Sequence, residues 1–145
     1  MISNLIFVDN NATVDTLTIT SDPHNIAQVE NYIEEVRAKY NIADDVFGNI
    51  LISLTEAANN AIIHGNDSDP SKMVEITCQP DERGKRLTFT VKDHGKGFDY
   101  NSLPDPTAPE NIDQPCGRGV FLMMQLADLV AFSDHGTAVE MQFRI

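Results

Sequence analysis

The sequence has 145 residues, 41% of them hydrophobic, which is enough for one domain with a buried core and argues against a disordered chain. Its formal net charge of -12 argues against a nucleic-acid partner, because a surface that binds nucleic acid needs clustered Lys and Arg. No apolar run approaches the roughly 18 residues of a membrane span and the start shows no signal peptide, so we expect a cytoplasmic protein without a membrane partner.

The first forty residues predict a strand followed by a helix. Apolar residues alternate with threonines over 13–20, which is the period of a half-buried strand. Asp22 and Pro23 then supply an N-cap and a first helical residue, and the helix should end near Asn41. Its apolar residues recur at helical spacing: Ile26, Val29, Ile33, Val36 and Tyr40.

A second helix is predicted from 43–45 to about His64, with Gly65 as its C-terminal cap. Its buried side would comprise Phe47, Ile50, Leu54, Ala57, Ala58 and Ala61. Glu56, Asn60 and His64 follow one another at intervals of four residues, so they share a different stripe of this helix.

An antiparallel pair of strands follows, around a turn at 81–85. One strand carries Val74, Ile76 and Cys78, and the other carries Leu87, Phe89 and Val91. The second strand leads directly to Asp93. From 98 to 115 the periodicity disappears and four prolines interrupt the chain, which is typical of a long functional loop.

The last predicted elements are a helix from Gly119 to about Asp128 and a closing hairpin of 130–133 with 139–144. The inward residues of the helix would be Val120, Met123, Met124 and Ala127.

Neither the cysteines nor the histidines are spaced as metal ligands usually are. Cys78 and Cys116 lie far apart in the sequence, so we expect two free thiols. The histidines, His24, His64, His94 and His135, are expected not to bind metal. His64 is kept as a candidate because it continues the stripe of Glu56 and Asn60.

Glu56 and Asn60 form the first chemical motif. Residues at i and i+4 of a helix point the same way, so both can reach one ligand. An amide oxygen suits Mg²⁺, which takes few protein ligands beside phosphate oxygens, and the carboxylate can accept a proton from an attacking hydroxyl. A solvated helix face has the same spacing, and this interpretation stays open.

Asp93 forms the second motif, together with Gly95 and Gly97. Glycines let the backbone turn tightly and approach a flat ligand, and an Asp in this place can accept a hydrogen bond from an exocyclic amine. The alternative is a turn that only reverses the chain.

Gly117, Arg118 and Gly119 before the last helix form the third motif. Free backbone N–H groups and the helix dipole attract an anion there, and Arg118 can add a phosphate contact. Thr137, after Gly136, can reach a base through its hydroxyl. A plain helix start and a Gly-Thr hairpin corner are the alternatives.

In this order the motifs resemble those of the GHKL ATPases, and within them the serine kinase and anti-sigma factor branch of bacterial partner-switching systems. The similar segments are 54–65 for the N box, 93–99 and 117–123 for the two glycine boxes, and 136–139 for the terminal Gly-Thr segment. The resemblance covers the chain from about Thr16 to Ile145.

The resemblance implies an α+β fold, a two-layer sandwich of GHKL (Bergerat) type in which a mixed, mostly antiparallel sheet has helices packed on one face. It implies a single ATP-binding kinase domain over 1–145, with an N-terminal extension at 1–12 and an ATP lid at 98–116. The implied cofactors are ATP and Mg²⁺.

The resemblance also implies residue roles. Glu56 would be the general base, Asn60 the Mg²⁺ ligand and Asp93 the carboxylate that reads adenine. Further nucleotide contacts would come from His64, Gly95, Gly97, Gly117, Arg118, Gly119, Val120 and Thr137.

The expected function is therefore that of an ATP-dependent serine/threonine protein kinase, which phosphorylates a small STAS-like antagonist of an anti-sigma factor. The branch also suggests a bound sigma factor and a homodimer. The alternative is a non-catalytic, nucleotide-responsive module that sequesters a partner, although such a module would need Asn60 and Asp93 but no Glu56. A third hypothesis is an interaction domain whose vestigial pocket binds no ATP.

Overall fold

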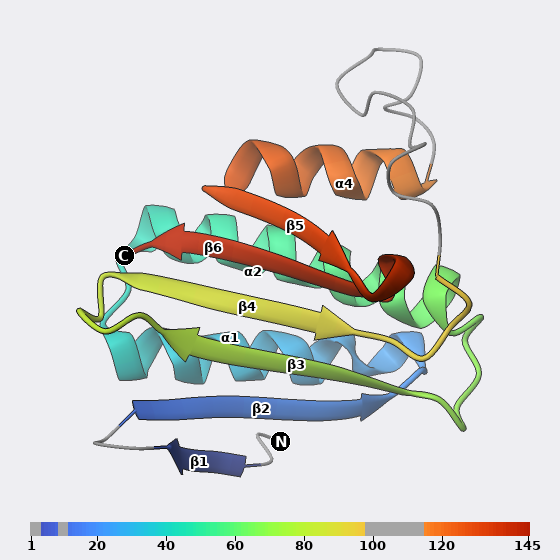
Figure 1. Cartoon of the computed structure of the whole chain (residues 1–145), viewed down its shortest axis with the longest axis horizontal. Helices are drawn as coiled ribbons and strands as arrows, with labels where there is room; N and C mark the ends of the chain where they lie inside the picture. The colour runs from blue at the N-terminus through green and yellow to red at the C-terminus, as the bar shows by residue number, and fades with distance from the viewer. Residues whose placement is uncertain (1–3, 9–11, 98–114) are drawn as a thin grey trace.

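The computed structural model describes residues 4–8, 12–97 and 115–145, and it describes side-chain surroundings for 15–97 and 118–145. The described strands form one sheet in the order β1-β2-β3-β4-β6-β5, in which every neighbouring pair is antiparallel (Figure 1). They are β1 Asn4–Val8, β2 Ala12–Thr20, β3 Met73–Pro80, β4 Arg86–Lys92, β5 Leu129–Ser133 and β6 Ala138–Arg144.

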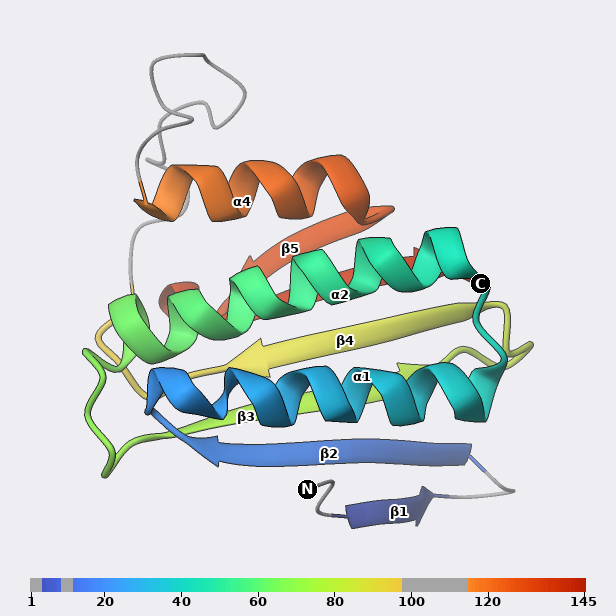
Figure 2. The ribbon, with the colours of Figure 1, turned by 180° about the vertical axis from the view of Figure 1, so that it is seen from behind.

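The described helices all lie on one face of this sheet, as the two opposite views show (Figures 1 and 2). They are η1 Pro23–Asn25, α1 Ile26–Tyr40, α2 Asp44–Asn59, the π-helical turn η2 Asn60–Gly65 and α4 Pro115–Leu126. A short turn, η4 Asp134–Gly136, joins β5 to β6. The predicted two-layer α+β fold is confirmed, and the sheet that we expected to be mixed is antiparallel in each described pairing.

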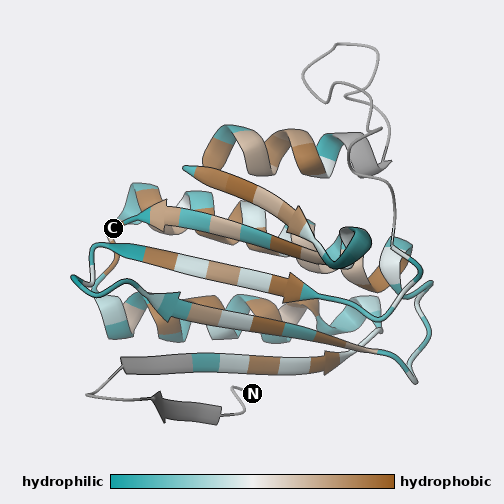
Figure 3. Ribbon diagram, in the orientation of Figure 1, coloured by the Kyte–Doolittle hydropathy of each residue, from teal (hydrophilic) through white to brown (hydrophobic). Residues whose placement is uncertain are grey.

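The core forms between the sheet and the helices because strands such as β3 and β4 turn alternate residues toward the helices. From Val74 along β3 and from Leu87 along β4, every second residue is apolar and buried and its neighbours are not, and Figure 3 shows the same alternation. Ile76 pairs with Val91 and Cys78 with Phe89, as the predicted hairpin requires. Each large apolar side chain buried in this way contributes about 1.5–3 kcal/mol of transfer free energy.

The predicted first helix is present with both of its end signals. Asp22 is the N-cap of the opening turn η1, where its carboxylate accepts a hydrogen bond from His24 N at 2.9 Å. Asn41 ends α1 in the left-handed conformation, with φ of 53°.

The second predicted helix differs at its C-terminal end. α2 continues into η2, and the residue that follows, Asn66, has φ of -96°. Gly65 is the last residue within η2 and its φ is not positive, so the prediction that Gly65 is the C-terminal cap was wrong. A glycine is needed there for another reason: a Cβ on Gly65 would lie 2.5 Å from the carboxylate carbon of Asp93.

The last helix also begins earlier than predicted. α4 starts at Pro115 rather than at Gly119, which agrees with the preference of proline for the first helical position. Gly119 therefore lies within the helix, not before it. Met124 was predicted to face inward and is 50% exposed, because α4 buries the stripe of Val120 and Met123 instead.

One described segment, Asp44–Gly65, is apolar and long enough to cross a membrane by length and composition alone. We had expected no such run. In the fold this segment is the central helix, which packs on the sheet between α1 and α4 (Figure 2). The core helix of a soluble protein passes the same test of length and composition.

Candidate functional site

A pocket of about 450 Å³ lies between α2, α4 and the adjoining ends of β4 and β6, a volume that suits a small organic ligand. It is lined by six of the predicted site residues: Asn60, His64, Asp93, Gly97, Val120 and Thr137. Segments far apart in the sequence thus meet at one place.

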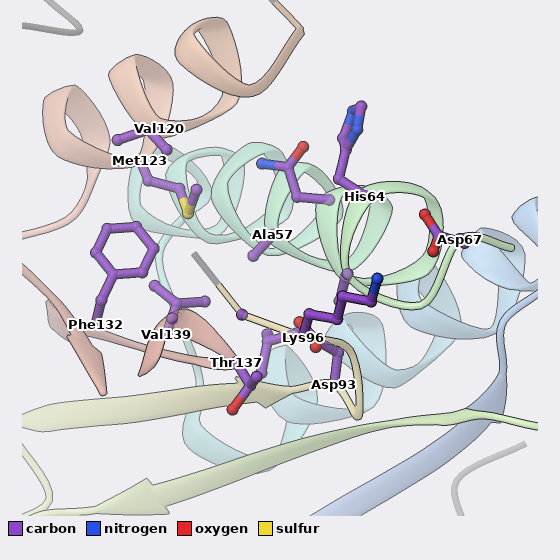
Figure 4. Close-up of a pocket in the computed structure, with 16 residues that line it drawn as sticks. Ala57, His64, Asp67, Asp93, Lys96, Val120, Met123, Phe132, Thr137 and Val139 are labelled. Atoms are coloured by element: carbon purple, nitrogen blue, oxygen red, sulfur yellow. The ribbon is translucent and has the colours of Figure 1, made fainter. Parts of the chain in front are cut away.

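The two ends of the pocket differ in polarity. Apolar side chains from α4, β5 and β6 gather at one end, and polar side chains from η2 and the loop after β4 gather at the other (Figure 4). The apolar set is Val120, Met123, Phe132 and Val139, and the polar set is His64, Asp67, Asp93 and Lys96. This arrangement suits a ligand with a flat apolar part and a polar part.

Asp93 is held by the backbone directly after β4. Its N–H donates to Thr137 O at 2.8 Å, and its Oδ1 accepts from Gly95 N at 2.8 Å. Within the described part of the chain Oδ2 has no donor, so it can accept a hydrogen bond from a ligand. Burial raises the pKa of Asp93, and the Gly95 N–H offsets part of this effect.

The glycines around Asp93 allow backbone segments to touch. A Cβ on Gly95 would coincide with the carbonyl of Gly65, and a Cβ on Gly97 would meet the carbonyl of His135. Gly97 also has φ of 76°, which favours glycine. The loop after β4 is therefore packed against η2 on one side and against the β5–β6 turn on the other.

The turn before Thr137 is unusual because Asp134, His135 and Gly136 all have positive φ, at 53°, 58° and 88°. Such conformations cost on the order of 1–3 kcal/mol for a non-glycine residue and gather at functional sites. The Thr137 hydroxyl donates to Asp134 O at 2.8 Å, so its hydrogen is used within the turn and a ligand could only donate to this oxygen.

Glu56 and Asn60 meet the last helix next to the pocket. A Cβ on Gly119 would lie 2.7 Å from Asn60 Nδ2 and 3.2 Å from Glu56 Oε2, so only a glycine lets α4 approach this pair. Glu56 is half-buried and does not line the pocket itself. The structure thus brings the first and third predicted motifs into contact.

Two other predicted site residues, Gly95 and Arg118, lie outside the pocket lining. Gly95 packs behind Asp93 and Arg118 is exposed, while Gly117 lies in the first turn of α4. The predicted lid falls mostly on 98–114, which lies outside the described residues. The side chain of Cys116 also lies outside the part of the chain whose side-chain surroundings are described.

Several lining residues were not predicted as site residues. They are Ala57, Ala61, Gly65, Asp67, Val91, Lys96, Met123, Phe132, Gly136 and Val139. The small and apolar ones carry the same periodic signal as core residues, so the sequence alone could not separate them. Lys96 was detectable, because it lies between the two glycines of the second motif.

The chain matches the Histidine kinase-like ATPase domain family over residues 19–143 and belongs to it. This family assignment confirms the GHKL resemblance, and an ATPase domain implies that the chain binds ATP.

Among individual proteins, the chain is similar to bacterial regulators. It is 27% identical to the serine-protein kinase RsbW of Bacillus subtilis (strain 168) over 139 residues, which are 91% of this chain and 86% of that protein. It is 30% identical to the anti-sigma F factor of Clostridium perfringens (strain 13 / Type A) over 124 residues, 81% of this chain and 78% of that protein. It is 33% identical to the anti-sigma F factor of Anoxybacillus flavithermus over 95 residues, 61% of this chain and 62% of that protein.

Proposed function

We propose that this chain is an ATP-dependent serine/threonine protein kinase of a partner-switching system, which phosphorylates a small antagonist protein and binds a sigma factor. The observation that carries the proposal is the contact of Glu56 and Asn60 with Gly119 beside the pocket, while Asp93 lies at the polar end of the same pocket. The names of the relatives, a serine-protein kinase and anti-sigma factors, support it.

The residues present fit ATP and Mg²⁺. Asp93 Oδ2 would accept a hydrogen bond from the adenine amine, and apolar side chains such as Val139 would cover the ring. Because Asp67 and Asp93 line the pocket of a chain with net charge -12, a cation is needed beside the phosphates. The amide oxygen of Asn60 would hold Mg²⁺, which supplies that neutralising charge when bound.

Glu56 would act on the hydroxyl of the protein substrate. Its carboxylate would accept the hydroxyl proton as the oxygen bonds to the γ-phosphorus and the bond to ADP breaks. Its half-buried position one helical turn from Asn60 would keep it next to the phosphate end of the nucleotide and away from the base. Lys96, on the pocket wall, would add positive charge for the anionic nucleotide.

The remaining parts of the proposal rest on the family resemblance. The chain would form one kinase domain over 1–145, with 98–116 as the ATP lid, and it would act in the cytoplasm as a homodimer. Gly95, Gly97, Gly117 and Arg118 would contact the nucleotide, with His64 near its phosphates.

A direct test is phosphoryl transfer. The full chain is incubated with Mg²⁺ and ATP labelled at the γ-phosphate, together with small STAS-like proteins, and the labelled residue is mapped. We expect one serine or threonine of one antagonist to be labelled, and an alanine at that position to abolish the label. ATP binding without transfer to any antagonist would contradict the kinase proposal.

Such a result would favour the second candidate, a nucleotide-responsive binding module. The observation in favour of this candidate is that Glu56 does not line the pocket.

A further inference from the structure

Asn66 is fully buried and uses its whole side chain in hydrogen bonds, yet it does not line the pocket. Its Oδ1 accepts from the backbone N–H of His94 at 2.8 Å. Its Nδ2 donates to Ser21 Oγ at 2.8 Å and to Met73 O at 3.1 Å. The amide therefore joins the end of β2, the start of β3 and the loop after β4.

The π-helical turn η2 explains why this side chain points inward. Asn66 N donates at 2.8 Å to Ala61 O, five residues earlier, instead of to the carbonyl four residues earlier. One additional residue per turn rotates the following residue by about 100°, and π-helical turns are frequent at functional sites. Asn66 is thus directed toward the end of the sheet rather than toward solvent.

The hydrogen bond to His94 is one of several contacts between the same two segments. Gly65 packs directly on the Asp93 carboxylate, and Gly95 packs on the Gly65 carbonyl. Both of these contacts limit how close the segments approach, but neither has the direction of a hydrogen bond. In the described structure, the bond from His94 N to Asn66 is the directional link that fixes the peptide next to Asp93.

We infer that Asn66 is a positioning residue for recognition of the adenine base. By fixing the His94 N–H, it holds the backbone so that Asp93 Oδ1 receives the Gly95 N–H and Oδ2 remains available to accept from the ligand. An amide suits this position because its Nδ2 donates to Ser21 Oγ and Met73 O, whereas a carboxylate oxygen would face the Met73 carbonyl without a donor. This inference rests on the proposed function, in which Asp93 reads adenine.

The test compares Asn66→Ala, Asn66→Asp and Ser21→Ala in the full chain. Ser21→Ala is the matched control, because it removes a hydrogen bond of the same buried cluster but leaves the bond to His94. Asn66→Asp keeps an oxygen that can accept from His94 N while losing the donors. Affinities for Mg-ATP and Mg-GTP are measured by calorimetry, and stability is measured by thermal unfolding.

We expect all three variants to unfold at lower temperature. Only Asn66→Ala should bind Mg-ATP more weakly, by about tenfold, with little change for Mg-GTP, so that the preference for ATP falls. Asn66→Asp should restore most of that preference. If Asn66→Ala does not fold, Asn66→Ser, whose side chain is too short to reach His94, replaces it in the same comparison.

Two outcomes would overturn the inference: an unchanged ATP preference in Asn66→Ala, or an equal loss of preference in Ser21→Ala. A further comparison separates this inference from the proposed function. If Asp93→Asn leaves ATP affinity unchanged, the adenine assignment itself fails. If Asp93→Asn weakens ATP binding, Asn66→Ala in that background should add less than about twofold, because both act through the same carboxylate.

Discussion

Asp93 is a carboxylate whose surroundings favour its neutral form, although the proposed role needs its negative charge. The pKa is raised above its ordinary value of 3.8, with burial as the main cause. The folded state therefore holds the proton more tightly than the unfolded state, so the stability contributed by this group falls as the pH rises through the region above 3.8. Functional residues often lower the stability of the folded state in this way.

Asp93→Asn should separate binding from stability. We expect Mg-ATP affinity to fall by about 10- to 100-fold, because a hydrogen bond to a charged group is lost. Without nucleotide, the variant should unfold at a temperature equal to or above that of the wild type at about pH 7, and this difference should shrink toward about pH 4. The exposed Glu82→Gln is the control for a change of carboxylate to amide. Normal ATP affinity in Asp93→Asn would show that this residue does not read the base.

Alanine substitutions of Glu56 and Asn60 should impair different steps, although the two residues lie one helical turn apart. Glu56→Ala should keep ATP affinity while phosphoryl transfer to the antagonist falls by roughly 10²- to 10⁴-fold, the usual contribution of a positioned base. Asn60→Ala should lose Mg²⁺ and with it both binding and transfer. Glu34→Ala, on the exposed side of α1, is the control. Transfer at the wild-type rate in Glu56→Ala would point to another base, such as His64.

At the scale of elements, the site depends on how closely α4 approaches α2. A glycine inside a helix is normally unfavourable by about 0.5–1 kcal/mol relative to alanine. The presence of Gly119 in the second turn of α4 therefore requires an explanation. The contact with Asn60 and Glu56 supplies this explanation. The packing of two helices thus sets the position of two polar side chains.

Gly119→Ala should therefore reduce activity more than stability. The new Cβ would press on Asn60 Nδ2, the flexible end of a side chain, so the amide should move while the helix gains propensity. We expect unfolding temperatures close to that of the wild type but weaker Mg-ATP binding and slower transfer. Gly48→Ala is the matched control, because Gly48 lies in α2 and a Cβ added there would meet no neighbouring group within 4 Å. Equal activity of the two variants would contradict this role of Gly119.

At the scale of the whole molecule, the pocket is formed jointly by the sheet and by the helical layer that covers one of its faces. β4 ends at Asp93, and β6 begins beside Thr137, to whose carbonyl the Asp93 N–H donates. The helical layer adds Asn60 from η2 and Val120 from α4. A ligand that contacts residues of both the sheet and the helical layer should stabilise the two layers together against unfolding.

Mg-ATP should therefore raise the unfolding temperature of the full chain. At about 100 times its dissociation constant a ligand stabilises the native state by about 2.7 kcal/mol. For a domain of this size each kcal/mol raises the midpoint by roughly 2–4 °C, so the shift should be several degrees. Differential scanning fluorimetry of nucleotide-free protein measures it, with Asn60→Ala as the variant that should respond less. The absence of any shift at saturating Mg-ATP would exclude an ATP-binding pocket.

Much of the local structure was predictable, because it depends on short-range patterns. The alternation along β2 and the pairing of β3 with β4 follow from a period of two, and the start of η1, which leads into α1, follows from Asp22 and Pro23. Asp93 was placed correctly at the end of a strand for the same reason. The start of α4 was missed although Pro115 is a start signal, because the glycines that follow favoured a loop.

The sequence by itself determined the order of the elements and the motifs that meet in the pocket, since each is written in neighbouring residues, and the α+β class followed from the family resemblance of those motifs. The tertiary structure alone decided why Gly65 and Gly119 must be glycines, that η2 is a π-helical turn, and that Asn66 bonds to His94. Each of these features depends on contact between segments distant in the sequence, such as Gly65 with Asp93 and Gly119 with Asn60. Local periodicity carries no information about such contacts, because it records only which face of an element is buried and not what lies against it.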